Sequence, residues 1–333
     1  MSNQKLRRLL WRHYRIWLLT AVIVLIAAGL KEGMSVVNQP NIYVHPGAFT
    51  LEEGGVLRML IAVVVYFVLG LTMFLHDNWT NFNHYLFALP VVRRRIYRQK
   101  IGLMVVAVTI GYILMQGIYF VAIQSVLAKR HAYFMWGNSW RIELSRLILL
   151  LVLMMIGTTF GLWVGHIFAS VFAGIVFSLS MIFAYNGMIN LLSGISGMQY
   201  RQLDILNRLD SGSWLELGVA IIAGVVFGGF LYWLNAWGFD HLSLEDSREF
   251  FRFPELRSAV LWFSIIYLII ATSCSEFGLE ILGIITDNYP EHMPIGTGIV
   301  MGLVIGYLTW SLGRWFLYRP DKFRDVWTFK KLS

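Results

Sequence analysis

Long apolar runs separated by short polar segments make up most of the chain. A helix needs about 20 residues to cross the roughly 30 Å hydrocarbon core of a bilayer. Eight runs approach or exceed that length: Ile16–Leu30, Leu57–Leu75, Ile101–Leu127, Leu147–Val164, Ile167–Leu192, Trp214–Trp237, Ala259–Phe277 and Ile295–Leu317. The pattern predicts an all-α integral membrane protein with about eight transmembrane helices, in which residues 1–333 form a single transmembrane domain.

The composition agrees with a membrane protein. Of the 333 residues, 57% are hydrophobic and only 14% are charged, whereas soluble proteins carry about a quarter charged residues. This excludes an ordinary soluble enzyme. The single cysteine excludes an internal disulfide and a multi-cysteine metal site. The net charge of +8 lies mostly between the apolar runs, so we expect membrane lipids and no nucleic acid as partners.

The basic residues predict an orientation. Of the 27 lysines and arginines, 19 lie in the N-terminal segment and in the alternate segments that share its side. The positive-inside rule then places both the N- and C-termini in the cytoplasm, as an even number of spans requires. The segment that contains Lys129 and Arg146 argues against this orientation. We expect a multi-pass protein of a bacterial cytoplasmic membrane.

Few side chains inside the apolar runs could perform chemistry. The runs carry almost no charged residues, and the chain lacks both a G-x-x-x-x-G-K-[ST] phosphate loop and an H-E-x-x-H zinc motif. Gly302 and Gly306 in the last run have the spacing that lets two helix backbones approach closely. The sequence therefore predicts no catalytic, metal or cofactor site in this chain.

Glu276 and Glu280 are the exception near the outer end of the seventh run. They are four residues apart, so on one helix they would share a face. If the helix continues, Glu276 lies inside the bilayer, and both residues are candidates for a cargo path. In the alternative, the span ends at Ser275 and both carboxylates reach the outer headgroup layer.

The segment after the second run is amphipathic. Trp79, Phe82, Tyr85, Leu86 and Leu89 recur at three- and four-residue spacings, which predicts one face of a helix lying at the membrane interface. Pro90 breaks this helix and is expected in the first turn of the next one, where its missing N–H needs no partner. The arginines of residues 93–95 would face an anionic leaflet or an acidic protein surface.

This segment resembles the loop after the second span of ABC-2 type permeases, the transmembrane subunits of bacterial ATP-binding-cassette transporters. That loop reads approximately LP-x-S/T-R-x-x-I-x-x-x-K. The residues that match in register are Leu89, Pro90, Arg93, Ile96 and Lys100. Val92 stands where the family often has Ser or Thr, so a helix-capping hydroxyl is missing. The resemblance implies a type V-like ABC-2 permease fold, with residues 81–100 as the coupling helix that docks into the ATPase subunit.

A second stretch, Ser243–Arg257, is similar to larger permeases of this family in Gram-positive bacteria. Those often carry S-E-x-x-G-x-x-F-x-F-x-x-L there, and Arg248 stands where glycine is common. The resemblance implies a second contact with the ATPase. The coupling residues it implies are Tyr85, Leu86, Leu89, Pro90, Arg93, Arg94, Arg95, Ile96, Lys100, Glu245, Arg248 and Phe251.

The resemblance also implies a function. The chain would be half of a transporter, paired with an identical or related permease and with ABC ATPase subunits that bind the ATP and Mg. The transporter would export an amphiphilic or hydrophobic cargo, such as a peptide antibiotic, a lipid-like compound or a drug. Such efflux would provide antimicrobial resistance. Two other classes stay open. One is a lipid-modifying enzyme using Asp204, Asp210 and Glu216, and the other is a sensor or immunity protein that binds a peptide.

Overall fold

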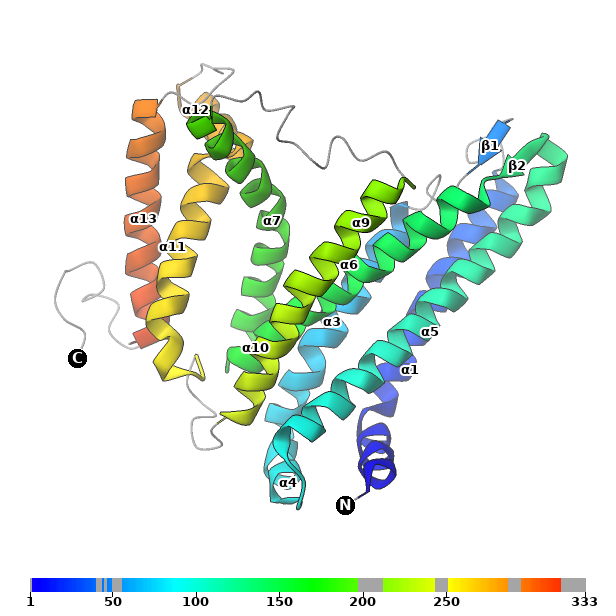
Figure 1. The fold of residues 1–333 in the computed structure, drawn as a ribbon, viewed down its shortest axis with the longest axis horizontal. Helices are drawn as coiled ribbons and strands as arrows, with labels where there is room; N and C mark the ends of the chain where they lie inside the picture. Colours follow the sequence, from blue (N-terminus) through cyan, green and yellow to red (C-terminus); the bar gives the residue numbers. More distant parts are fainter. Residues whose placement is uncertain are drawn as a thin grey trace. The chain divides into compact units, whose positions relative to one another are not determined.

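The computed structural model describes residues 2–39, 44, 47–49, 56–196, 212–242, 251–286 and 295–318 (Figure 1). Among these residues, eight helices are long and apolar enough to cross a membrane. By their length and composition, these helices confirm the prediction of an all-α, multi-pass membrane protein. The α-helices are α1 (Asn3–Asn38), α3 (Val56–Trp79), α4 (Phe82–Ala88), α5 (Arg93–Leu127), α6 (Trp136–Trp163), α7 (Ile167–Ser196), α9 (Trp214–Ala223), α10 (Gly229–Asp240), α11 (Arg257–Ser273), α12 (Glu276–Thr286) and α13 (Ile295–Tyr318).

The chain divides into two compact units. Unit 1 comprises Met1–Leu162 and Leu209–Glu245, and unit 2 comprises Trp163–Arg208 and Asp246–Ser333. In unit 1, α1 and α5 lie side by side and run in the same direction (Figure 1). They have 36 and 35 residues, which at 1.5 Å per residue gives each a length of about 50 Å. Both helices therefore extend well beyond a bilayer core.

Glycines bring the helices of unit 1 into backbone contact. A Cβ atom at Gly29 of α1 would lie 2.6 Å from the carbonyl oxygen of Met115 in α5. On α6, Gly157 and Gly161 lie directly against the carbonyl oxygens of Phe67 and Leu71 in α3. Gly157 and Gly161 have the G-x-x-x-G spacing, which permits such an approach.

A small β-structure closes one end of unit 1. Strands β1 (Gly47–Phe49) and β2 (Ala132–Phe134) pair in parallel, with Phe49 opposite Phe134. The amide of Met135 extends the ladder by donating to the carbonyl of Phe49 at 2.9 Å. Phe49 belongs to a buried cluster that includes Tyr119 and Ile123 of α5. We call this the β-end of unit 1; the hydrophobic pattern did not predict it.

The sixth predicted span is one continuous helix with a wide turn in its middle. The π-helical segment η3 (Gly224–Gly228) joins α9 to α10, and π-turns of this kind insert one extra residue into a helix. Next to it, Asn235 of α10 donates from Nδ2 to Thr159 Oγ1 of α6 at 3.0 Å. This bond connects α10 to α6 across an apolar interior.

In unit 2, α11 contacts both α7 and α13. Tyr267 of α11 and Ser180 of α7 share a hydroxyl–hydroxyl bond of 2.8 Å. The G-x-x-x-G pair of the last run packs within the chain, because Cβ atoms at Gly302 and Gly306 would lie 3.6 Å and 3.2 Å from the side chain of Ile269. These two glycines therefore serve the packing of α13 on α11.

Candidate functional site

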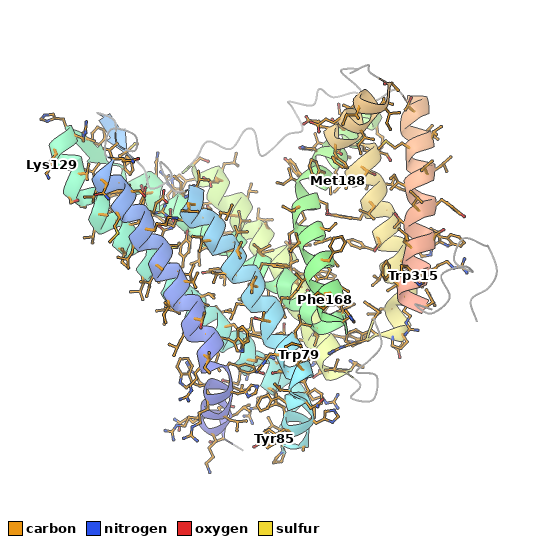
Figure 2. All side chains as sticks on the ribbon, turned by 180° about the vertical axis from the view of Figure 1, so that it is seen from behind. Trp79, Tyr85, Lys129, Phe168, Met188 and Trp315 are labelled. Carbon is orange, nitrogen blue, oxygen red and sulfur yellow. The ribbon has the colours of Figure 1, made fainter. Side chains whose placement is uncertain are left out.

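The polar connection between α3 and α5 forms an elbow at one end of unit 1. Asn81 adopts a left-handed conformation (φ 53°), which asparagine tolerates better than most residues, and the chain then turns into α4. We call residues 80–95 the elbow. In Figure 1, α4 lies at the same end of unit 1 as the chain's N-terminus. Figure 2 shows Tyr85 at this end and Lys129 at the opposite end of α5.

The start of α5 differs in one respect from the prediction. Pro90 was expected in the first helical turn, but α5 begins at Arg93 with Val92 as its N-cap. Leu89 is extended (φ −73°, ψ 146°), because a proline disfavours helical geometry in the residue before it, and Val92 is extended as well. Val92 makes no side-chain capping bond, because its side chain has no polar atom.

Two arginines fasten the elbow to the end of α10. Arg93 Nη1 donates to the carbonyl oxygens of Asp240 at 2.9 Å and Leu242 at 3.0 Å, and its guanidinium lies 4.1 Å from the ring centroid of Phe87. Arg94 Nε pairs with the Asp240 carboxylate. The last carbonyls of a helix lack intrahelical donors, and cations are favourable there. Arg93 therefore caps α10 and orients the elbow.

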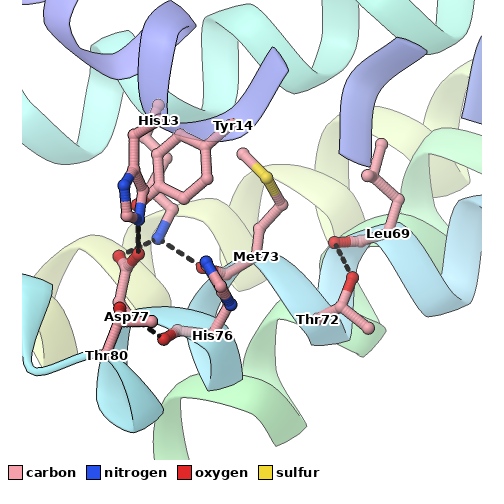
Figure 3. A network of polar contacts seen from close by, with 9 residues as sticks. His13, Tyr14, Leu69, Thr72, Met73, His76, Asp77 and Thr80 are labelled. Carbon is pink, nitrogen blue, oxygen red and sulfur yellow. Dashed lines mark hydrogen bonds and ion pairs between the residues drawn. The ribbon is translucent and has the colours of Figure 1, made fainter. Parts of the chain in front are cut away.

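A buried charge cluster lies directly behind the elbow. We call Tyr14, Asp77 and Lys100 the α4-end cluster; all three are fully buried. Lys100 Nζ pairs with the Asp77 carboxylate and donates to the Met73 carbonyl at 2.8 Å. Tyr14 donates its hydroxyl to the same carboxylate. Figure 3 shows Tyr14 and the neighbouring His13 facing Asp77.

The α4-end cluster joins three helices. Tyr14 comes from α1, Asp77 from α3 and Lys100 from α5. Lys100 Nζ also lies 3.8 Å from the ring centroid of Phe74, a contact that favours the charged form. A buried ion pair offsets its desolvation only when further hydrogen bonds satisfy both groups, and these contacts supply them. The cluster holds the three helices together beside the elbow.

The residues of α4, α5 and their connection that the resemblance implies in coupling differ in exposure. Lys100, Leu86 and Ile96 are buried and face the interior of unit 1. Leu89 and Arg93 are partly exposed. The surface of the elbow is formed by the exposed side chains of Tyr85, Pro90, Arg94 and Arg95. Beside it, a groove of about 430 Å³ is lined by Arg94, Arg95 and Arg98 of α5 and by Trp233 and Trp237 of α10.

A second charge cluster lies toward the β-end. We call Arg58, Tyr112, Gln116, Glu143 and Arg146 the β-end cluster. Tyr112 and Gln116 of α5 both donate to the Glu143 carboxylate of α6, and Arg146 lies 3.4 Å from the same group. Arg58 of α3 is almost completely buried, with its guanidinium 3.6 Å from the ring centroid of Tyr119. This cluster joins α3, α5 and α6.

The β-end cluster lies where the helices extend beyond the predicted apolar runs. The predicted fourth run begins at Leu147, whereas α6 begins at Trp136, so Glu143 lies within the helix. Its acceptor contacts come from Tyr112 and Gln116, which are inside the predicted third run. Arg58 lay at the start of the second run. A charge at the edge of an apolar run is the signal that would have located this cluster.

The second predicted coupling segment is described only in part. Glu245 and Arg248 lie outside the described residues. Phe251 is buried, with its ring centroid 5.9 Å from that of Trp163. The backbone of Arg252 donates to the Trp163 carbonyl at 3.1 Å, and burial lowers the pKa of the Arg252 side chain to about 10. The described part of this segment therefore packs inward in unit 2.

The two acidic candidates of the seventh run start a separate helix. Helix α11 ends at Ser273 and α12 begins at Glu276, as expected if the span ends near Ser275. Asn190 of α7 donates to the Cys274 carbonyl at 3.0 Å, inside this break. Glu276 and Glu280 are both exposed. Their place in a cargo path stays a prediction.

Of the acids considered for a lipid-modifying enzyme, Glu216 lies within the described residues. Asp204 and Asp210 lie outside them. Glu216 accepts from the Gly212 amide at 2.7 Å, and its own amide donates to Ser213 Oγ at 3.1 Å. This is a variant of the capping box at a helix N-terminus, in which the carboxylate accepts from the residue before the N-cap. Glu216 therefore stabilises the start of α9.

The described residues contain no group of three His, Cys, Asp or Glu side chains that could hold a metal ion. Comparison with known proteins returns no matching family model, no matching curated protein and no matching solved structure. The geometry that stands out in the described residues is the elbow, which combines an exposed aromatic and basic surface with a buried ion pair behind it.

Proposed function

We propose that this chain is the transmembrane permease subunit of an ABC transporter, and that a separate ATPase subunit docks on the elbow. The observation that carries the proposal is that the exposed surface of the elbow lies next to the buried ion pair of the α4-end cluster. Tyr85 is 51% exposed, while the α4-end cluster immediately behind the elbow is fully buried.

A braced elbow can transmit motion. The ion pair between Lys100 and Asp77 joins α5 to α3, and Arg93 holds the elbow on α10. A displacement of α4 by a partner would therefore move several membrane helices together. A flexible loop would absorb the same displacement. Coupling by rigid-body movement of packed helices is a known form of conformational change.

The elbow surface indicates the chemistry of its partner. Arg94 and Arg95 are exposed beside Tyr85, and arginine and tyrosine are enriched where protein interfaces bind tightly. A groove with acidic rims on the ATPase would complement this surface. The ATP and Mg would bind to the ATPase, with no cofactor in this chain.

The spans indicate the class of cargo. Their apolar and aromatic character favours an amphiphilic or hydrophobic compound, such as a peptide antibiotic, a lipid-like compound or a drug, over an ion. We propose export, with a second identical or related permease completing the path. ATP binding would draw two ATPase subunits together and move both elbows.

Co-purification tests this function. The tagged chain is isolated from its native membrane in mild detergent and compared with Tyr85→Ala/Arg95→Glu, which changes only exposed elbow residues. Lys129→Glu is the matched control, because it reverses one exposed charge at the opposite end of α5. We expect an ATPase subunit and ATP hydrolysis with the wild type and the control, and loss of both with the elbow variant. A wild-type chain that elutes without an ATPase, or an elbow variant that retains it, would contradict the proposal.

A further inference from the structure

A second groove in unit 1 runs between α1 and α5 and has a volume of about 570 Å³. Its polar end is lined by Arg7, Arg8 and Trp11 of α1. Its apolar end includes Leu19 of α1 with Val106 and Ile110 of α5, each between 45% and 49% exposed. The groove is therefore amphipathic along its length, with charge at one end and hydrocarbon surface at the other.

The apolar lining of the groove covers part of one leaflet of a membrane. On α5 it runs from Leu103 to Ile110, seven residues apart, which corresponds to about 10 Å of helix rise. One leaflet contributes about 15 Å of hydrocarbon to the bilayer core. Tryptophan favours the depth of the lipid headgroups, which places the arginines one turn beyond, at phosphate depth.

No carboxylate among the described residues neutralises the charge at the polar end of the groove. No carboxylate lines the groove, and the first acidic residue of α1 is Glu32, more than five turns away. Arg7 and Arg8 are both exposed. Two guanidinium groups at headgroup depth attract a phosphate, and each basic residue near an anionic surface contributes about 1 kcal/mol.

The bottom of the groove is shaped to fit an acyl chain. Leu18, Leu103 and Ala107 are buried beneath the exposed walls. Farther along, α1 and α5 approach closely, because a Cβ atom at Gly111 would lie 2.8 Å from Leu25 Cδ1. A helix is 10–12 Å wide with its side chains, whereas an acyl chain is much thinner and can lie in the seam between two such helices.

We propose that this groove binds one anionic phospholipid of the leaflet that surrounds the N-terminal half of α1. Arg7 and Arg8 bind its phosphate, Trp11 lies beside its glycerol region, and an acyl chain follows Leu19, Val106 and Ile110. This site is independent of the docking of an ATPase. Its occupant would fix α1 against α5, the two helices that carry Tyr14 and Lys100 of the α4-end cluster.

Native mass spectrometry of the purified, delipidated full chain tests the site. Phosphatidylglycerol is the anionic probe and phosphatidylcholine the zwitterionic one. Two variants remove opposite ends of the groove: Arg7→Gln/Arg8→Gln removes the charge, and Val106→Trp fills the apolar channel at an exposed position. Arg12→Gln/Arg15→Gln is the matched control, since both residues are exposed on α1 and neither lines the groove. Gel filtration and circular dichroism check that each variant is folded.

We expect one tightly bound phosphatidylglycerol on the wild type and on the control. Arg7→Gln/Arg8→Gln should bind it about thirtyfold more weakly, because both groove arginines are lost. Val106→Trp should also bind it more weakly, and phosphatidylcholine should bind weakly to all four proteins. Equal losses in the two arginine variants would overturn the proposal, because the attraction would then be a diffuse property of the basic helix. Full binding to Val106→Trp, equal binding of the two lipids, or a second copy of the chain in place of the lipid would also overturn it.

Discussion

The ion pair between Lys100 and Asp77 stabilises unit 1 only while both charges are present. Both side chains are completely buried. Removing one member of such a pair leaves an uncompensated charge inside the protein. Without Lys100, the Tyr14 hydroxyl would still donate to the Asp77 carboxylate. Without Asp77, the Met73 carbonyl would still accept from Lys100. A single substitution at either residue therefore has a large effect on the free energy of unfolding, although it leaves the protein surface unchanged.

We expect Lys100→Met to lower the free energy of unfolding by about 3–5 kcal/mol, because the Asp77 carboxylate stays buried without its counter-ion. Arg98→Met is the matched control, since Arg98 lies on the same helix and is exposed. Thermal unfolding of both variants in detergent, followed by circular dichroism, measures the difference. Similar melting temperatures for the two variants would show that the pair does not brace the elbow.

The Glu143 carboxylate is the acceptor on which the β-end cluster depends. Glu143→Gln keeps an acceptor oxygen for Tyr112 but removes the charge that faces Arg146 and the buried Arg58. We expect a loss of about 1–3 kcal/mol, the usual effect of weakening hydrogen bonds to a charged group. Glu280→Gln, at an exposed position, should leave the melting temperature unchanged. An equal effect at both positions would contradict the geometry of the cluster.

Among the elements, α3 and α6 pack with their backbones in direct contact. Gly157 and Gly161 place the backbone of α6 on carbonyl oxygens of α3. The sequence contains this G-x-x-x-G spacing, and it contains the similar spacing of Gly302 and Gly306 in a more glycine-rich run. Spacing alone does not tell which neighbour a small-residue stripe will meet, since this depends on the packing of the whole unit.

Gly157→Ala tests this contact. The added methyl group would overlap the Phe67 carbonyl oxygen, so the helices must move apart, and we expect a loss of about 1–3 kcal/mol. Gly117→Ala on α5 is the control, because its Cβ would meet open space and alanine favours a helix over glycine. Melting temperatures in detergent distinguish the two. A tolerated Gly157→Ala would mean that α3 and α6 pack less closely than described.

The eight spans were predictable because the bilayer imposes a minimum length of apolar helix. Helix ends were predicted less well, since α1 and α5 continue through polar residues that no apolar pattern marks. The α4-end cluster could not be predicted, because Tyr14 and Asp77 are 63 residues apart and only folding brings them together. The three-residue strands of the β-end carry no period that a sequence window can detect.

In the whole molecule, the proposed function depends on what the elbow binds. Photo-crosslinking in living cells tests this directly, with a benzoylphenylalanine residue at position 85 or 133. Tyr85 and Tyr133 are 51% and 64% exposed and lie at opposite ends of unit 1. We predict an adduct from position 85 alone, to a protein whose peptides include a G-x-x-x-x-G-K-[ST] motif. No such adduct from position 85, or the same adduct from position 133, would contradict the account.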